Sequence, residues 1–261
     1  MTKVSVNIIQ GMLILSVICL FSIAGAEEIT GRQLAQKVFD RDRGKNSVST
    51  AQMVLVSKRG KKRIRHFTTK RIEENGLETQ MTRFTAPADI DGTGFLNVEK
   101  PGWETEQFLY LPALKRTRRI VSSQKDQRFV NSDFTYEDME RHPVSDYTYK
   151  ITGSTNVGNM DCHILESRPK QGVESQYGLT ISTISKGGLV PVHVKFYDKK
   201  NKHIKTYNVL KLEQVQGIWT EIIISMEDHK KNHKTYIKQD KITYNTNIKT
   251  DDLSRKNLEN Y

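Results

Sequence analysis

The chain has 261 residues, with 41 Lys and Arg against 30 Asp and Glu, a formal net charge of +11 and only two cysteines. This length fits one large all-β or α+β domain as readily as two small ones. In a cytosolic protein such a charge would indicate nucleic-acid binding, because counterion release draws basic surfaces onto phosphate backbones. The start of the chain argues against that class.

Residues 1–26 have the plan of a cleaved secretory signal peptide. Lys3 precedes an apolar run over residues 12–23, and Ala24-Gly25-Ala26 forms an A-x-A site, so we predict cleavage before Glu27. The run is short for a membrane span and no basic stop-transfer cluster follows it. We therefore expect a periplasmic protein, soluble after cleavage, whose basic charge serves membrane approach or docking, with solubility as the alternative.

The cysteines and histidines indicate neither a disulfide nor a metal site. Cys19 follows the bulky Ile18, which argues against lipidation, and Cys162 is then the single cysteine of the mature chain, expected to be a small buried hydrophobe. His229 and His233 lie four residues apart but lack the H-E-x-x-H glutamate. We expect no metal and no cofactor.

The predicted elements begin with one short helix and continue as strands. Thr30 is placed to cap an amphipathic helix that Gly44 can stop. From Ser47 the pattern changes to period two, with a turn at residues 58–61, and Asn75-Gly76 predicts a type I′ hairpin. Further strands are predicted at residues 78–84, 94–99, around Phe108, and at 147–153, 161–167, 179–184, 190–197, 204–212, 219–226 and 235–244.

These elements predict an α+β fold that is mostly antiparallel β. No helical period is long enough to supply βαβ crossovers, and we find no internal repeat or flexible linker, so residues 27–261 are expected to form a single domain. A meander of this many strands should curl into a curved, incomplete β-barrel with a few covering helices. A curved sheet of this kind has a concave side.

Two neighbouring motifs carry the most information. Residues 108–120 read FLYLPALKRTRRI, in which Pro112 favours a turn between an aromatic strand and a basic strand. Phe108 and Tyr110 share one face of the first strand, and Leu109 and Leu111 share the other. Residues 133–138 then read DFTYED.

Together these motifs resemble the LolA-like family of outer-membrane lipoprotein-sorting proteins. Its members carry a similar F-L-Y-L-P-x-L-x-R-x-R-R strand pair and S-D-F-[ST]-Y-E-D corner. The resemblance implies an incomplete β-barrel whose helices cover an apolar cavity, and a carrier that shields acyl chains in the periplasm. It further implies an inner-membrane transporter of the resistance-nodulation-division (RND) type as a partner.

The motifs supply two sets of candidate site residues. The candidates for lining a ligand cavity, which are alternatively core residues, are Trp103, Phe108, Leu109, Tyr110, Leu111, Phe134 and Tyr136. The candidates for docking to lipid phosphate or an acidic partner, or for pairing with one another, are Lys115, Arg116, Arg118, Arg119, Asp133, Glu137 and Asp138. We expect at least one of the arginines to pair with the acidic corner.

No catalytic motif accompanies these candidates, so we expect a non-enzymatic protein. The leading hypothesis is a periplasmic carrier that binds a lipid or lipoprotein acyl moiety and passes it between membrane partners. The alternative is a non-transporting scaffold module that docks through its basic hairpin and has a filled interior. An open apolar space on the concave face would favour the carrier, whereas convergent polar groups inside it would point to an enzyme.

Overall fold

The computed structural model describes residues 29–102 and 104–260, so the predicted signal peptide and Trp103 lie outside the described residues. Thirteen strands form one sheet. The strands are β1 Asn46–Val56, β2 Lys62–Glu74, β3 Leu77–Ala86, β4 Gly94–Glu99, β5 Thr105–Leu111, β6 Arg116–Ile120, β7 Tyr147–Val157, β8 Met160–Pro169, β9 Tyr177–Ser185, β10 Pro191–Asp198, β11 His203–Val215, β12 Ile218–Asp228 and β13 His233–Tyr244.

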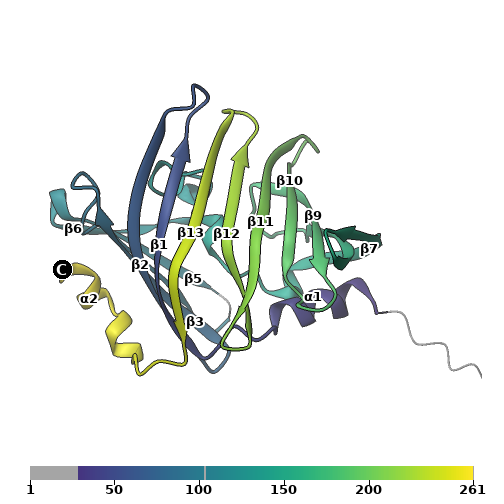
Figure 1. Ribbon diagram of the computed structural model, residues 1–261, viewed down its shortest axis with the longest axis horizontal. Helices are drawn as coiled ribbons and strands as arrows, with labels where there is room; N and C mark the ends of the chain where they lie inside the picture. The colour runs from purple at the N-terminus through teal and green to yellow at the C-terminus, as the bar shows by residue number, and fades with distance from the viewer. Residues whose placement is uncertain (1–28, 103, 261) are drawn as a thin grey trace, which may run out of the picture.

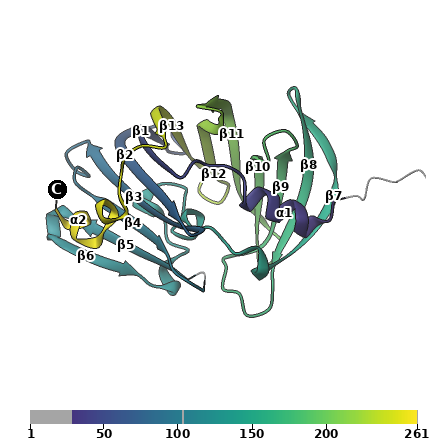
Figure 2. The ribbon, with the colours of Figure 1, turned by 90° about the horizontal axis from the view of Figure 1, so that it is seen from below.

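The sheet consists of two antiparallel meanders, β1 to β6 and β7 to β13. They are joined where the first strand, β1, pairs with the last strand, β13. The order is β6-β5-β4-β3-β2-β1-β13-β12-β11-β10-β9-β8-β7, and β1 pairs antiparallel with β13. The sheet is strongly curved, and its two edge strands, β6 and β7, are connected by residues 121–146 (Figures 1 and 2). The predicted mostly antiparallel, incomplete barrel is confirmed.

Local turn and cap chemistry explains several of the boundaries. Asn75 and Gly76 have φ values of 53° and 77°, as a type I′ hairpin requires. Thr30 caps α1 Gly31–Phe39 with a capping box, as the sequence predicted, although α1 ends before Gly44. A side chain at Gly31 would come within 2.8 Å of the Tyr149 backbone, so this glycine allows α1 to pack closely on β7.

Residues 121–146, which we call the strap, pack against the concave face of the sheet. The concave face carries Phe84 and Phe95, and the strap residues Phe129 and Tyr136 join them in one buried cluster. Ring centroids lie 4.9 Å apart for Phe95 and Phe129, and 5.9 Å apart for Phe129 and Tyr136. These aromatic contacts anchor the middle of the strap to the first meander.

The C-terminal segment packs on the convex face of the first meander. The helix α2 Arg255–Glu259 and the preceding 3₁₀ turn Thr250–Leu253 insert Leu253 and Leu258 among convex side chains of β2 to β4. Figure 1 shows α2 beside the β3 to β6 half of the sheet. The sequence patterns did not predict this element, because a helix of five residues is too short to show a clear helical period.

The second meander has its own core. Leu34 and Ala35 of α1 pack with Val144 of the strap and with Leu165 and Ile184 of the sheet. In a separate cluster, Cys162 is fully buried beside Val190 and Val192. It is a small buried hydrophobe, as predicted.

Candidate functional site

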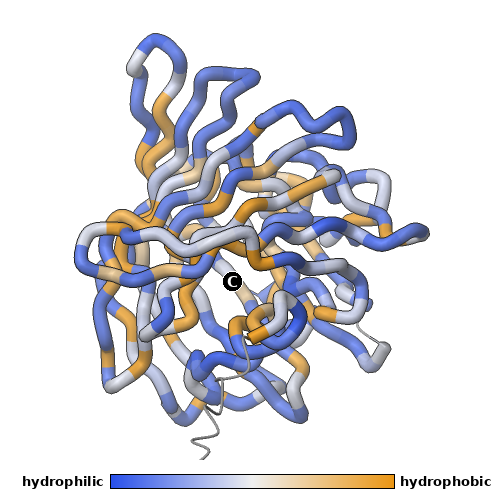
Figure 3. Tube along the Cα trace, turned by 90° about the vertical axis from the view of Figure 1, so that its right-hand side faces the viewer, coloured by the Kyte–Doolittle hydropathy of each residue, from blue (hydrophilic) through white to orange (hydrophobic). Residues whose placement is uncertain are grey.

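A groove of about 740 Å³ runs along the concave face between the sheet and the strap. This volume falls within the range of small-molecule binding pockets. Its apolar lining comes from both meanders and from the strap: Met53, Phe67, Phe84, Phe129, Phe134, Leu179, Val194, Phe196, Trp219, Ile224, Met226, Ile237 and Ile242. In Figure 3, hydrophobic segments gather in the interior of the curve, while the outer loops are hydrophilic.

Two isoleucines form the middle of the groove floor. Ile224 of β12 and Ile237 of β13 are direct cross-strand partners, and both line the groove. They are only partly buried although they lie on central strands, whereas Ser225 and Thr235 of the same strands are fully buried. The concave face is therefore not filled by its own side chains at this point.

Tyrosine side chains supply much of the polar lining. Tyr147, Tyr149, Tyr177 and Tyr207 all line the groove. Burial raises the pKa of Tyr149 to about 12, and burial likewise raises the pKa of Tyr177 and of Tyr207. All of these phenols are neutral at physiological pH, so they present an apolar ring with one hydrogen-bonding end.

Part of the groove lining is ionic. The Arg43 and Arg71 guanidinium groups lie 2.7 and 3.2 Å from the same Glu78 carboxylate oxygen. Arg141 Nε of the strap lies 3.3 Å from Glu99 Oε1. Burial raises the pKa of Glu99 in spite of the opposing effects of the Glu78 backbone N–H and of Arg141. This cluster ties the strap to β2, β3 and β4.

The acidic DFTYED corner clamps the strap to the second meander, including β13. Asp133 accepts hydrogen bonds from Arg128 at 2.8 Å and from Thr235 Oγ1 at 2.6 Å. Glu137 accepts from the Gln176 backbone N–H at 3.0 Å and from the Ser175 hydroxyl. The third carboxylate, Asp138, has its own set of donors.

Asp138 lies in a buried polar triad. Its Oδ1 accepts a hydrogen bond from the Tyr177 hydroxyl at 2.6 Å, and its Oδ2 lies 2.9 Å from Lys205 Nζ. Lys205 also donates to the Tyr177 oxygen at 2.9 Å. Asp133 thus holds the strap to β13, Glu137 holds it to the loop before β9, and Asp138 holds it to β9 and β11, which gives the motif a structural role.

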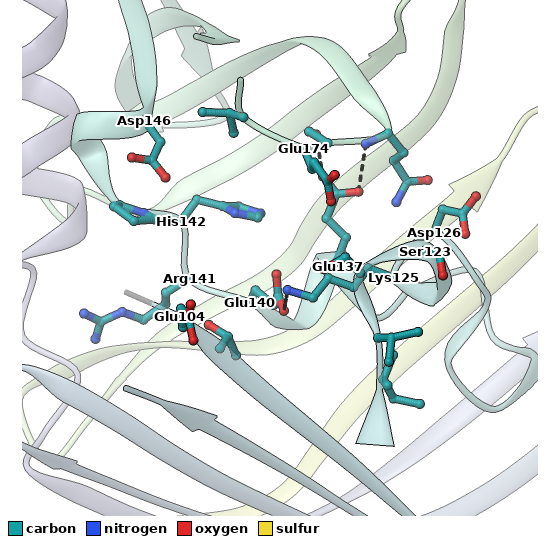
Figure 4. A pocket seen from close by; sticks show the side chains of 18 of the residues that line it. Glu104, Ser123, Lys125, Asp126, Glu137, Glu140, Arg141, His142, Asp146 and Glu174 are labelled. Atoms are coloured by element: carbon teal, nitrogen blue, oxygen red, sulfur yellow. Dashed lines mark hydrogen bonds and ion pairs between the residues drawn. The ribbon is translucent and has the colours of Figure 1, made fainter. Parts of the chain in front are cut away.

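A second, polar cleft of about 1010 Å³ adjoins the groove. Figure 4 shows its charged side chains, including Lys125 and Glu140, whose Nζ and Oε1 lie 2.7 Å apart. Burial raises the pKa of Glu140 although Lys125 opposes that shift. The cleft and the groove share the lining residues Glu137, Glu140, Arg141, His142 and Ser175. The strap therefore forms the boundary between the two hollows.

The predicted cavity residues divide between the two faces and the strap. Phe108 and Tyr110 pack on the convex face with the C-terminal segment, and Leu109 and Leu111 pack in the concave aromatic cluster. Tyr136 is buried in that same cluster, while Phe134 lines the groove. Among the described residues of this set, Phe134 is thus the one that faces the open space, and the others contribute packing.

The basic strand meets the acidic corner through Tyr136, whereas the carboxylates of the corner have other partners. Arg119 pairs with Glu106 at 3.2 Å, and Arg118 hydrogen-bonds the Tyr136 phenol, whose pKa burial nevertheless raises. Lys115 and Arg116 are exposed at the β5–β6 turn. The expected pairing between this strand and Asp133, Glu137 or Asp138 is not the one found, because the strap carries those carboxylates away from β6 to donors on other elements.

The two histidines singled out in the sequence lie in different environments. His233 Nδ1 is 2.6 Å from Asp133, whereas His229 contacts Thr206 and packs at a tilt of 53° against His203 with ring centroids 4.5 Å apart. Within residues 29–102 and 104–260, no group of three or more His, Cys, Asp or Glu side chains is arranged to hold a metal ion. Over the same residues, no helix is long and apolar enough to cross a membrane.

Sequence reasoning missed most of the groove floor. Ile224 and Ile237 were placed on predicted strands, but the pattern alone did not show which face of those strands lies inside the curve. The apolar alternation of residues 190–197 was the available signal, since Val194 and Phe196 line the groove. Lys205 was missed because a lysine in a strand is ordinarily exposed.

Known proteins resemble this chain in sequence and in fold. A family model described only as that of an uncharacterized protein matches residues 76–260. A crystal structure of a DUF1329 family protein from Desulfovibrio piger is 30% identical, with a TM-score of 0.82, and the match covers 87% of this chain and 97% of that one. The chain belongs to the DUF1329 family. No curated protein matches it.

The fold of this DUF1329 protein is LolA-like. A domain from Vibrio parahaemolyticus, named for outer membrane lipoprotein sorting, is 28% identical with a TM-score of 0.82, and the match covers 88% of this chain and 98% of that one. A LolA superfamily protein from Nitrosomonas europaea is 14% identical with a TM-score of 0.68, over 88% and 99% of the two chains, and shows the shared fold. The chain therefore shares its fold with a domain named for lipoprotein sorting and with a LolA superfamily protein.

Proposed function

We propose that this protein is a non-enzymatic periplasmic carrier that binds a lipid or lipoprotein acyl moiety in the concave groove and transfers it between membrane partners. The observation that carries the proposal is the partly exposed isoleucine floor, Ile224 and Ile237, inside a groove of about 740 Å³. The predicted signal peptide and the LolA-like fold support the compartment and the carrier role.

The chemistry of the groove suits an acyl chain. Each methylene removed from water contributes about 0.8 kcal/mol, so a chain of ordinary length needs a long apolar surface and little else. Aliphatic and aromatic side chains supply that surface, and the neutral phenol of Tyr149 can donate a hydrogen bond to a carbonyl or ester oxygen. The carrier function requires no covalent step and no cofactor.

Recovery of bound lipid from the native protein tests this proposal. The protein is purified from envelope fractions and examined by native mass spectrometry and by lipid extraction. We expect a bound species with an acyl chain, at lower occupancy in the Ile224→Trp variant. Repeated purification without any lipid, or equal lipid on wild type and variant, would count against the groove as the binding site.

We also propose an RND-type inner-membrane transporter as a partner, because the sequence motifs resemble a family whose relatives accompany such pumps. Site-specific photocrosslinking in the envelope tests this partner. Recovery of a transporter subunit is the expected result, and a set of crosslinks that contains no inner-membrane transporter would refute the docking part of the proposal while leaving the carrier part standing.

The alternative function is a scaffold module that docks through its basic hairpin. The exposed tip of the β5–β6 hairpin favours it, since Leu114 is 67% exposed next to Lys115 and Arg116. The scaffold predicts that substitution of this tip abolishes partner binding, whereas groove substitutions have no effect. The carrier proposal instead predicts that groove substitutions lower lipid occupancy, whereas substitutions of the hairpin tip leave it unchanged.

A further inference from the structure

Three hairpin tips lie side by side along one rim of the sheet. They connect β1 to β2, β10 to β11 and β12 to β13. The antiparallel register places Val56 at the end of β1 opposite Lys234 on β13, and Lys205 on β11 opposite Asp228 at the end of β12. Figure 1 shows these three tips together at the top of the molecule.

These tips carry a dense set of exposed cations, which we call the basic rim. The exposed basic residues of the rim are Lys58, Arg59, Lys61, Lys62, Arg63, Lys199, Lys200, Lys202, Lys230 and Lys231. No Asp or Glu occurs from Ser57 to Ile72. The tips are accordingly hydrophilic in Figure 3. The charge excess of the chain is thus concentrated on one edge of the fold.

The two aspartates nearest these lysines are engaged with their own turns. Asp198 Oδ1 accepts hydrogen bonds from the backbone N–H groups of Lys200 and Lys202 at 3.0 and 2.9 Å. Asp228 Oδ1 accepts from those of Lys230 and Lys231 at 2.9 and 3.0 Å. Their contacts with lysine Nζ atoms are long, 3.7 and 3.9 Å, and involve lysines that are half exposed. Such pairs neutralise little of the outward field.

We infer that the basic rim docks this protein onto membranes that carry anionic phospholipids. The inference rests on the proposed carrier function, for which it names the membrane contact. The three hairpins span the strands from β2 to β10 in the sheet order, a width of about 25 Å at the spacing of neighbouring strands. A row of this width can meet many headgroup phosphates at once, and each Lys or Arg near an anionic surface adds to the attraction.

The form of the rim favours a membrane over other polyanions. The cations stand on protruding tips, and Lys199 is the one among them that lines a hollow. No Phe, Tyr or Trp occurs in residues 57–63, 199–202 or 229–233 that could stack on a base. Most are lysines, whose flexible point charges tolerate mobile headgroups better than a fixed bidentate site does. Attachment by charge alone is also reversible, as a shuttling carrier requires.

The rim also borders the hollows of the fold. Lys199 of the β10–β11 tip lines the polar cleft, and that cleft meets the acyl groove along the strap. A protein docked through the rim therefore brings the polar cleft close to the headgroup layer. The docking surface and the proposed cargo site are therefore connected through the residues along the strap that line both hollows.

Vesicle flotation with charge-matched variants tests the inference. The rim variant, Arg59→Gln/Lys200→Gln/Lys231→Gln, removes one cation from each tip. The control, Lys37→Gln/Lys150→Gln/Lys256→Gln, removes the same charge from exposed positions on α1, β7 and α2. Both are compared with wild type on pure phosphatidylcholine vesicles and on vesicles containing phosphatidylglycerol, over a series of salt concentrations.

The expected result is salt-sensitive binding of wild type to the anionic vesicles only. The rim variant should lose about fivefold in partitioning per cation, about a hundredfold in total, while the control loses much less. Equal loss in both variants would overturn the inference, because net charge and not the rim would then drive binding. Absence of wild-type binding would overturn it too and would leave an acidic protein as the rim's partner.

A fluorescent fatty-acid titration of the same variants separates this inference from the proposed function. The rim variant should bind the fatty acid as wild type does, because its substitutions lie outside the groove lining. If the rim variant binds both the fatty acid and the vesicles as wild type does, the docking role of the rim is rejected and the carrier proposal stands. Absence of fatty-acid binding by wild type would reject the carrier proposal.

Discussion

Asp133 of the strap and Thr235 of β13 form a reciprocal pair across 102 residues of sequence. The Asp133 backbone N–H donates to Thr235 Oγ1 at 3.0 Å, and that hydroxyl donates to Asp133 Oδ2 at 2.6 Å. Both residues are essentially inaccessible to solvent. Because β13 also pairs with β1, this contact fixes the strap at the junction of the two meanders.

Substitution of Asp133 should loosen this junction. We expect Asp133→Ala to lower the free energy of unfolding by about 3 kcal/mol, because Arg128 and Thr235 lose a buried partner. Urea unfolding measures the change. The matched control is Asp126→Ala on an exposed part of the same strap, which should change stability by less than about 0.5 kcal/mol. Similar effects of both substitutions would argue against a clamp at Asp133.

The Lys205–Asp138 pair should behave as a coupled unit. Both side chains are buried, at 7% and 5% exposure, and Lys205→Met alone leaves the carboxylate without its cation, at a cost of about 3 to 5 kcal/mol. The double variant Lys205→Met/Asp138→Asn should recover part of that loss. A double-mutant cycle in urea gives the coupling, and additive effects would contradict it.

Glu140 should make stability depend on pH. Burial raises its pKa, so the folded protein holds this proton more tightly than the unfolded chain does. Its contribution is therefore complete below the ordinary glutamate pKa of about 4.3 and disappears as pH rises through the higher folded value. The Glu140→Gln variant should gain stability relative to wild type across that window, as thermal unfolding between about pH 4 and 7 can show.

The control for Glu140 comes from the same cleft. Glu174 also lines the polar cleft but is exposed, so Glu174→Gln should track wild type at every pH. A constant difference between Glu140→Gln and wild type, independent of pH, would show that the raised pKa of this carboxyl does not govern stability.

The C-terminal helix should contribute to the stability of the whole sheet. Leu258 is fully buried against β4, and a side chain at Gly94 would come within 2.6 Å of it. We expect Leu258→Ala to cost about 2 to 5 kcal/mol, and its exposed neighbour Lys256→Ala to be nearly neutral. Guanidinium unfolding of the two variants makes the comparison. A neutral Leu258→Ala would show that the segment is only loosely attached.

The strands were predictable because each has a period-two pattern and a local turn signal. The Asn75-Gly76 turn and the strand Gly94–Glu99 were placed from such local chemistry, as was the capped helix α1. Antiparallel neighbours that follow one another in sequence need little further information, and the meander order of the sheet followed from them.

The groove was not predictable to the same degree, because it depends on long-range pairing. The β1–β13 contact and the route of the strap bring together residues about 100 or more positions apart. Period two assigned Phe108 and Leu109 to opposite faces, but only the packed structure shows Phe108 beside the C-terminal segment and Leu109 under the strap. The acidic motif was visible in sequence, whereas its buried partners were not.

The proposed carrier holds an acyl chain in the groove above Ile224 and Ile237. A fluorescent fatty-acid titration of wild type, Ile224→Trp and Ile64→Trp tests it most directly, since Ile64 is an exposed isoleucine, 49% accessible, outside the groove lining. We expect Ile224→Trp, with a folded circular-dichroism spectrum, to bind at least tenfold more weakly, while Ile64→Trp binds as wild type does. Equal affinity for all three proteins, or no binding by wild type, would contradict it.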